Sequence, residues 1–596
     1  MDFRIPKSVP RWVRDKLVKM PKKHFLLLIA VIIGFLSGLV AVLLKNLVHL
    51  IQLLLTSGFV KDYFNILYVV YPLLGIVLTV WIVQKVMKND PGHGIPSVLY
   101  AISRRKSTMK KQSMFSALLT SFVTVGFGGS AGLEAPTVQT TAAMGSNLGA
   151  ALKLNYKART LLIGCGAAAA LASIFKAPVA AIVFAIEVIM IDLTTASLVP
   201  LLLASISALL TRSFFLGEDV LFHFSLRDPY HFSDTHFYIL LGIFTGVFSV
   251  YFNKIFQFIT RSLSRIVKPY RRALFGGLML GLIIFFFPAL YGEGYEVINA
   301  LLADDLRKVT ENSIFYDFTG NASMMLLFIA CLLVLKVVAT AFTLGSGGVG
   351  GIFAPTLFMG STLGFLFTRL FRFLDIKELS ASNFTLVGMA GLMAGVMHAP
   401  LTAIFLIAEI TGGYELFVPL MLTAAISYYT AKLITPYTLY TGELARKGDL
   451  ITHNKDKAVL TLMNLREEVE TNFQSVQPDW TLGQLVKAVS KSNRNIYPVV
   501  DPNGHLIGIV TLDDIRQIMF DQSQYEEMQV HMFMTSPPEI IYTKDSMAKV
   551  MTKFDESGAW NLPVVENHKY IGFVSKSKLF SAYRRLLKEF SPDDEN

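Results

Sequence analysis

The stretch FKAPVAAIVFAIEVI at residues 175–189 returns later in the chain as MHAPLTAIFLIAEIT at residues 397–411. Each copy has an Ala-Pro pair, then an apolar run, then an acid, so that Glu187 aligns with Glu409. A duplication of this kind inside apolar sequence indicates that the chain is built from two related halves.

A second matched pair lies upstream of the first in each half. Residues 133–149, LEAPTVQTTAAMGSNLG, match residues 352–364, IFAPTLFMGSTLG, once a four-residue gap is allowed. Duplicated halves are typical of transporters with inverted repeats, whose site lies near the bilayer midplane where interrupted helices meet. The sequence therefore predicts an α-helical polytopic membrane domain with an inverted internal repeat, its halves spanning about 25–215 and 236–440.

The composition also predicts a membrane protein. Of the 596 residues, 53% are hydrophobic and 16% are charged. The uncharged run from Phe25 to Leu44 is long enough to cross roughly 30 Å of hydrocarbon. Other apolar segments follow at about 64–84, 113–128, 178–211, 236–258, 274–291, 324–344, 384–408 and 414–434. The two cysteines, Cys165 and Cys331, lie in apolar segments, which argues against a disulfide framework and against a metal site.

Positive charge is concentrated before residue 450. Residues 1–24 carry eight lysines and arginines, so the positive-inside rule predicts a cytoplasmic, basic N-terminal helix, with a solvated leader as the alternative. The net charge of +11 suits an anionic permeant and needs no nucleic acid as an explanation. We expect an integral protein of the cell membrane (plasma or inner), in contact with lipid, with a membrane domain over 25–450 and both termini cytoplasmic.

From residue 451 to 596 the sequence becomes mixed and polar, which predicts a soluble cytoplasmic domain. Within it, NIYPVVDPNGHLIGIVTLDDI at 495–515 and NLPVVENHKYIGFVSKSKL at 561–579 both read as strand, turn, strand and helix start. This duplicated module resembles a tandem pair of CBS domains, at about 465–522 and 530–588, and the resemblance implies an α/β fold.

The CBS resemblance also implies a cleft that can hold an adenine nucleotide. Thr511 and Asp514 match the family's T-x-x-D, whose carboxylate can accept hydrogen bonds from a ribose diol. In the second unit Ser575 is followed by Lys578, so the acid is missing. Nucleotide binding at one half-site and a structural, dimer-bracing role both stay open, and no other cofactor is expected.

Three glycine-rich breaks interrupt the membrane sequence. They are PGHGIPS at 91–97, GGSAGLEAP at 128–136 and GSGGVGGIFAP at 345–355. Each leads into a helix start, where unpaired N–H groups and the positive end of the helix dipole suit a small anion. Chance matches to G-x-S-x-G and G-x-G-x-x-G lack the soluble strand or βαβ unit that a hydrolase or dinucleotide site needs, so no enzyme is predicted.

These breaks resemble the signature regions of the CLC family of chloride channels and chloride/proton exchangers, and the resemblance covers essentially the whole chain. The family's G-S-G-I-P, G-x-E-G-P and G-x-F-x-P are similar to residues 92–96, 132–136 and 351–355, and its late tyrosine is similar to Tyr440. The resemblance implies a chloride or other small-anion substrate and a homodimer with a separate pore in each subunit. It implies an anion site formed by His93, Gly94, Ile95, Ile352, Phe353 and Tyr440.

The resemblance also implies that Glu134 is the external gating glutamate. Its carboxylate mimics an anion and competes for a site beside a positive helix end, and protonation removes that attraction. A satisfied structural acid is the alternative, but ionisable residues inside membranes more often serve function.

Two departures from the family pattern bear on mechanism. His93 stands at the family's anion-coordinating serine, where an imidazolium would make conduction titrate near neutral pH; backbone N–H groups alone are the alternative. Val188 stands at the inner proton-transfer glutamate and cannot carry a proton, while Glu187 and Glu409 are expected to cap or bridge helices. This favours a chloride channel gated by voltage and pH; the alternative is an anion/proton antiporter with a non-standard proton route.

Overall fold

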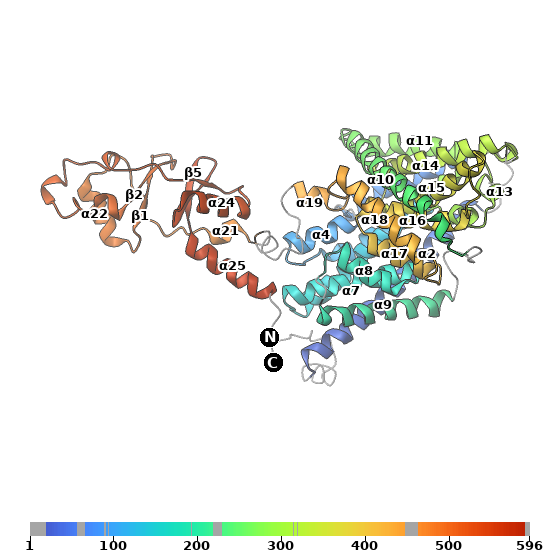
Figure 1. Ribbon diagram of the computed structural model, residues 1–596. Coiled ribbons are helices and arrows are strands. Elements are labelled where there is room, and N and C mark those ends of the chain that lie inside the picture. The colour runs from blue at the N-terminus through green and yellow to red at the C-terminus, as the bar shows by residue number, and fades with distance from the viewer. Residues whose placement is uncertain are drawn as a thin grey trace. The chain divides into compact units, whose positions relative to one another are not determined.

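The computed structural model of the chain (Figure 1) describes most of the sequence. The described residues are 20–56, 66–88, 91–92, 94–191, 194–217, 229–313, 315–318, 320–446, 460 and 463–590. The chain divides into two compact units, residues 1–447 and 448–596, which are treated separately below. Most of the expected N-terminal helix, residues 1–19, lies outside the described residues.

The first unit is built from helices (Figure 1). Its first half contains α2 (Lys22–Thr56), α3 (Leu67–Trp81), α4 (Ile95–Arg104), α5 (Ser116–Gly126), α6 (Glu134–Ala151), α7 (Tyr156–Phe175), α8 (Pro178–Glu187) and α9 (Thr195–Leu216). Its second half contains α10 (Thr235–Ser264), α11 (Pro269–Phe286), α12 (Tyr295–Leu302), α13 (Leu306–Val309), α14 (Ala322–Gly345), α15 (Phe353–Phe373), α16 (Ala381–Met397), α17 (Pro400–Ile410), α18 (Phe417–Ile434) and α19 (Gly442–Arg446). Among the described residues, eight helices are long and apolar enough to cross a membrane, and α5, α8, α16 and α17 are shorter apolar helices.

Two of the predicted apolar segments are each two helices rather than one. In the segment 384–408, α16 ends at Met397, His398 has a φ of 54°, and Pro400 begins α17. Proline suits the first turn of a helix, where its missing N–H group would have no intrahelical acceptor, so Pro400 is well placed to begin α17 after the break at His398. The segment 178–211 likewise contains two helices, α8 and α9, the second of which begins after the N-cap Thr194.

Helix α7 has no counterpart among the predicted spans. It is rich in alanine and glycine, and 72% of it is buried inside the unit. A Cβ on Gly166 would lie 2.4 Å from the Thr141 carbonyl oxygen of α6, so the two backbones approach too closely for a side chain. Membrane helices pack at such distances through small residues, and these residues also lower the hydropathy that would have marked the span.

The two copies of the repeat that opened the sequence analysis pack against each other as α8 and α17 (Figure 1). Glu409, near the end of α17, accepts from the N–H groups of Val179 and Ala180 at 3.0 and 2.8 Å. Glu187, at the end of α8, accepts from the N–H groups of Leu401 and Thr402 at 3.2 and 2.8 Å. Each acid therefore caps the start of the other helix, which satisfies N–H groups that a helix terminus leaves unpaired and complements its dipole.

The second unit contains two small sheets (Figure 1). Its strands are β1 (Ile496–Val500), β2 (Leu506–Thr511), β3 (Ile541–Tyr542), β4 (Asn561–Glu566) and β5 (Lys569–Ser575). Its helices include α21 (Leu465–Glu468), α22 (Leu482–Lys491), α23 (Leu512–Ile515), α24 (Met547–Ser557) and α25 (Lys576–Phe590). The hairpins β1–β2 and β4–β5 are both antiparallel and shift register at the same place, between Val499 and Val500 and between Val564 and Val565. The shared irregularity supports the duplication.

Glu470 joins the two repeated modules of this unit. Its Oε1 accepts from the Ser575 hydroxyl at 2.9 Å, and its Oε2 accepts from the Arg494 guanidinium at 2.5 Å. Its backbone pairs in both directions with Phe573. Partial burial alone would raise the pKa of Glu470, but the hydrogen bonds from Ser575 and Arg494 and the charge of Arg494 lower it overall.

Removing either cap carboxylate between α8 and α17 is expected to destabilise the membrane unit. In Glu187→Ala or Glu409→Ala two N–H groups lose their acceptor, which costs about 1–2 kcal/mol. The thermal unfolding midpoint of the purified protein in detergent should therefore fall. Glu415→Ala, at an exposed acid, is the control. Unchanged midpoints in both cap variants would contradict the capping role.

Candidate anion site

Two of the glycine-rich breaks are joined directly by backbone hydrogen bonds. The Gly132 N–H donates to the Gly351 carbonyl at 2.9 Å, and the Gly351 N–H donates to the Gly132 carbonyl at 2.7 Å. Helix α6 begins two residues after the first of these glycines and α15 two residues after the second. The N-terminal ends of α6 and α15, one from each half of the repeat, therefore meet, and their positive dipole ends favour a negative group.

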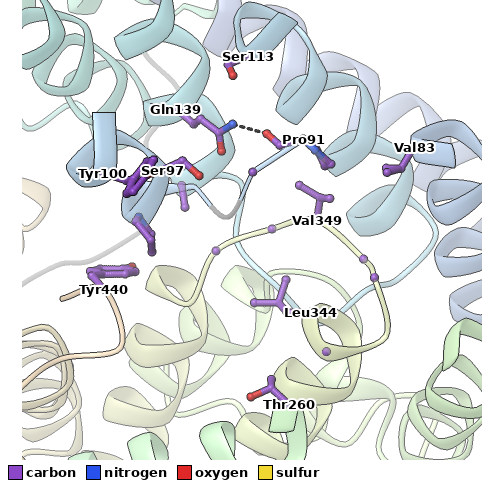
Figure 2. A pocket seen from close by; sticks show the side chains of 18 of the residues that line it. Val83, Pro91, Ser97, Tyr100, Ser113, Gln139, Thr260, Leu344, Val349 and Tyr440 are labelled. Atoms are coloured by element: carbon purple, nitrogen blue, oxygen red, sulfur yellow. Dashed lines mark hydrogen bonds between the residues drawn. The ribbon is translucent and has the colours of Figure 1, made fainter. Parts of the chain in front are cut away.

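Helix α6 is also hydrogen-bonded to the third glycine-rich break, residues 91–97. The Gln139 side chain accepts from the Gly94 N–H at 2.7 Å and donates to the Pro91 carbonyl, as Figure 2 shows for the second contact. Gly92 and Gly94 have φ values of 90° and 69°, a conformation that favours glycine. Because the Gly94 N–H is already bonded to Gln139, its predicted role in anion binding stays a prediction. His93 lies outside the described residues.

Glu134 lies in the first turn of α6 and is only 1% exposed. Its Oε1 accepts a hydrogen bond from the Tyr295 hydroxyl of α12. Within the described part of the chain no donor is hydrogen-bonded to its Oε2, although the backbones of Glu134 and Ala354 lie close to the carboxylate. A Cβ on Gly132 would lie 2.0 Å from Oε2 and 3.1 Å from the Cβ of Ala354. The carboxylate thus sits in the gap where α6 and α15 begin.

Tyr440 carries a buried hydroxyl of the kind an anion would satisfy. The residue is 6% exposed, and none of the described residues offers its hydroxyl a hydrogen-bond partner. It borders the cavity shown in Figure 2, together with Ile352 at the start of α15. A buried donor without an acceptor costs free energy, and a bound anion would remove that cost. Phe353 is fully buried, with its ring 5.2 Å from that of Phe175.

The cavity in Figure 2 is a vestibule of about 1180 Å³. The described residues that line it include no acid, while the cations among them are Lys88, Arg105, Lys110 and Arg272. Its inner end is formed by backbone and small side chains of the glycine-rich breaks, including Ala135 of α6 and Gly351. A cleft lined by one sign of charge concentrates ions of the opposite sign, so this vestibule favours anions.

The predicted inner proton position is buried as well as apolar. Val188 is 5% exposed and follows directly after α8, with its N–H donating to the Phe184 carbonyl at 2.9 Å. Its neighbour Glu187 is engaged in the helix cap described above.

Several polar groups near the site were missed by sequence reasoning. Tyr295 and Gln139 gave no signal, because neither residue type is unusual in its segment. Lys336 did give one, since a lysine in the predicted span 324–344 is an ionisable residue inside a membrane. It is fully buried, with its Nζ donating to the Gly292 carbonyl at 3.1 Å and lying 4.6 Å from the centre of the Phe358 ring.

In the second unit, Thr511 and Asp514 bond to each other. The Thr511 N–H and hydroxyl both donate to Asp514 Oδ2 at 2.7 Å, and the Asp514 N–H faces the Thr511 hydroxyl at 3.4 Å. This is a capping box at the start of α23. The T-x-x-D pattern therefore has a local structural role here, and a nucleotide contact remains a prediction.

Comparison with known proteins agrees with this geometry. A family described as voltage gated chloride channel matches residues 75–432, and the CBS domain matches residues 466–521 and 529–585. A putative chloride channel protein ClcB-like from Ralstonia nicotianae is 31% identical over 388 residues, covering 63% of this chain and 85% of the relative. The H(+)/Cl(-) exchange transporter ClcA from Vibrio cholerae is 27% identical over 457 residues, covering 74% of this chain and 93% of the relative.

The fold is also found among solved structures. That of a slow cyanobacterial Cl-/H+ antiporter superposes with a TM-score of 0.62 at 22% identity, covering 72% of this chain and 98% of the other. The predicted fold class, an α-helical CLC-like membrane unit with a C-terminal α/β unit, is confirmed. Because the family match spans more than half of the sequence, the chain belongs to the CLC family, with a pair of CBS domains at its C-terminal end.

Proposed function

We propose that this CLC protein exchanges a small inorganic anion, most simply chloride, for protons across a cell membrane, with Glu134 as the gate. The observation that carries the proposal is the position of the Glu134 carboxylate. It is buried where two helices begin, with one oxygen bonded to Tyr295 and the other beside Gly132, while the next residue, Ala135, lines the cation-lined vestibule.

In this proposal the Glu134 carboxylate and the transported anion compete for the same position at the start of α6 and α15. A carboxylate and a small anion both gain from the positive ends of α6 and α15, and like charges cannot share the gap. An arriving anion therefore displaces the charged carboxylate, and a proton on Glu134 removes its attraction to the gap. Alternating occupancy by anion and carboxylate couples the two ions.

The comparisons support exchange over the channel that Val188 favoured on sequence alone. The relative from Vibrio cholerae is named as an H(+)/Cl(-) exchange transporter, and the solved structure reported above is titled as an antiporter. A chloride channel is the second candidate, carried by the apolar Val188 and by the relative named as a putative chloride channel. These names indicate transport and give no support to an enzyme.

Three finer points belong to the same proposal. We take residues 25–450 as the conducting domain and residues 451–596 as a cytoplasmic CBS pair, with both termini cytoplasmic. The working state is a homodimer with one pore in each subunit, as the family resemblance implies. An adenine nucleotide is the ligand that the CBS pair would take, as its family resemblance implies.

Exchange is tested by recording chloride efflux and internal pH together in liposomes, while an ionophore sets the voltage. Wild-type protein is expected to drive protons uphill on a chloride gradient. Glu134→Gln is expected to retain chloride flux and to slow proton transport at least about tenfold, because an amide carries no exchangeable acid. Glu415→Gln, at an exposed acid, is the matched control. Chloride efflux without proton movement in the wild type would establish a channel instead.

A second prediction tests the proposed gate by placing a methyl group against the Glu134 carboxylate instead of replacing Glu134. In Gly132→Ala the new methyl group would meet Glu134 Oε2 at 2.0 Å, so the flexible carboxylate is expected to leave the gap. Anion flux should then lose most of its dependence on pH. In the Glu134→Gln background the same substitution should add little, and gel filtration checks that each variant remains folded.

Equal effects of Gly132→Ala in the two backgrounds would contradict a role through the carboxylate. The comparison is a double-mutant cycle, in which only coupled residues depart from additivity.

A further inference from the structure

A second carboxylate lies beside the gate. Glu293 is in the loop between α11 and α12, and its Oε1 accepts from the N–H of Leu133 at 3.2 Å. Leu133 directly precedes Glu134, and Tyr295, which holds Glu134, is two residues after Glu293. One short loop therefore presents both an acid and a hydroxyl to the first turn of α6.

A small cavity of about 50 Å³ lies beside this loop and the start of α6. Glu293 and Tyr295 line it, as do Leu133 and Thr137, which lie on one face of α6. The large vestibule is lined by Ala135 and Gln139 of the same helix, residues offset by two positions from Leu133 and Thr137. The two cavities thus reach the start of α6 from different faces. A space of this size with polar walls has room for a few water molecules.

The two acids differ in exposure. Glu134 is 1% exposed, whereas Glu293 is half-buried, and Lys45 on the rim of the small cavity is exposed. Glu293 lines the small cavity directly, whereas Glu134 does not, so water in that cavity would meet Glu293 first. On this face, the contact of Glu134 with the cavity is made by the Tyr295 hydroxyl that donates to its Oε1.

The charges that face Glu293 come from several helices. Lys45 of α2 and Lys336 of α14 attract it electrostatically, and Glu134 of α6 repels it. Arg212 of α9 is buried and lines the same cavity, in which Glu293 is the only acid among the described lining residues. Lys336 also holds the loop in place through its hydrogen bond to the Gly292 carbonyl. An acid set among cations with one competing acid is placed to gain and lose a proton as the gate changes charge.

We propose that Glu293 is the proton-loading carboxylate of this transporter, taking protons from water in the small cavity and passing them through the Tyr295 hydroxyl to Glu134. The proposal rests on proton-coupled exchange as the function. In the forward step, a proton from the bulk solution is relayed by water in the cavity to the charged Glu293, and the water is left neutral. That proton then passes by a water to the Tyr295 oxygen while the Tyr295 hydroxyl proton moves to Glu134 Oε1. Glu293 returns to its charged form, Tyr295 stays neutral and Glu134 becomes neutral.

A purely structural role for Glu293 would need only an acceptor for the Leu133 N–H. Glutamine supplies that acceptor in a side chain of the same size but carries no proton to exchange. Glu293→Gln therefore separates the two roles. Glu296→Gln is the matched control, since Glu296 is an exposed acid three residues further along the same segment.

The experiment measures chloride efflux and proton transport together in liposomes over a range of pH. Glu293→Gln is expected to keep chloride efflux within about twofold of wild type and to slow proton transport at least about tenfold. Tyr295→Phe should show the same split, Glu293→Asp should recover part of the proton transport, and Glu296→Gln should match wild type. Thermal unfolding of each variant in detergent checks the fold.

Wild-type exchange combined with unchanged proton transport in Glu293→Gln would overturn this inference alone. A parallel loss of both fluxes in a folded Glu293→Gln would also overturn it, because the acid would then act on the anion path. A wild-type protein that moves no protons would overturn the proposed exchange and this inference with it.

Discussion

The pair of backbone hydrogen bonds between Gly132 and Gly351 is the constraint on which the site depends. Each bond satisfies a polar group that would otherwise be costly inside a membrane. Together they tie the interrupted segment of one half to that of the other, just before α6 and α15 begin. Two helix N-termini then meet in a low-dielectric interior, where the attraction for a negative group is stronger than at a surface.

The Glu134 carboxylate is the negative group that occupies this place. An unoccupied meeting of two positive helix ends is unfavourable, and a side-chain carboxylate on the first turn of α6 can occupy it without leaving the chain. An anion can replace this carboxylate because the carboxylate is held weakly. Its Oε1 accepts one hydrogen bond from Tyr295, and its Oε2 lies beside Ala354 and Gly132 without a hydrogen-bond partner among the described residues. A site stabilised by backbone dipoles rather than by a buried cation holds an anion without trapping it.

The sequence predicted the repeat and the three breaks, and it singled out Glu134 within one of them, because duplication and glycine-rich interruptions are visible in local residue patterns. It did not predict α7, whose alanines and glycines serve close packing and so lack the hydropathy of a span. The sequence also did not predict the hydrogen-bond partner of Glu134, since Tyr295 lies far along the chain in a short helix with no distinctive pattern. The reciprocal caps of Glu187 and Glu409 were expected only in general terms, because the contact between α8 and α17 is tertiary.

The valine at position 188 and the carboxylate of Glu293 fit the proposed proton exchange. The vestibule of about 1180 Å³ is lined by Ala135, the residue after Glu134, and by Ile352, so water that entered it would meet the start of α6 without a side-chain relay. On the other face the space is only about 50 Å³, and the path to Glu134 passes through Tyr295. A relay acid is needed where water cannot approach the gate directly. On this reasoning the wide vestibule needs no relay carboxylate, which fits the valine at position 188, and the relay carboxylate belongs beside the narrow cavity.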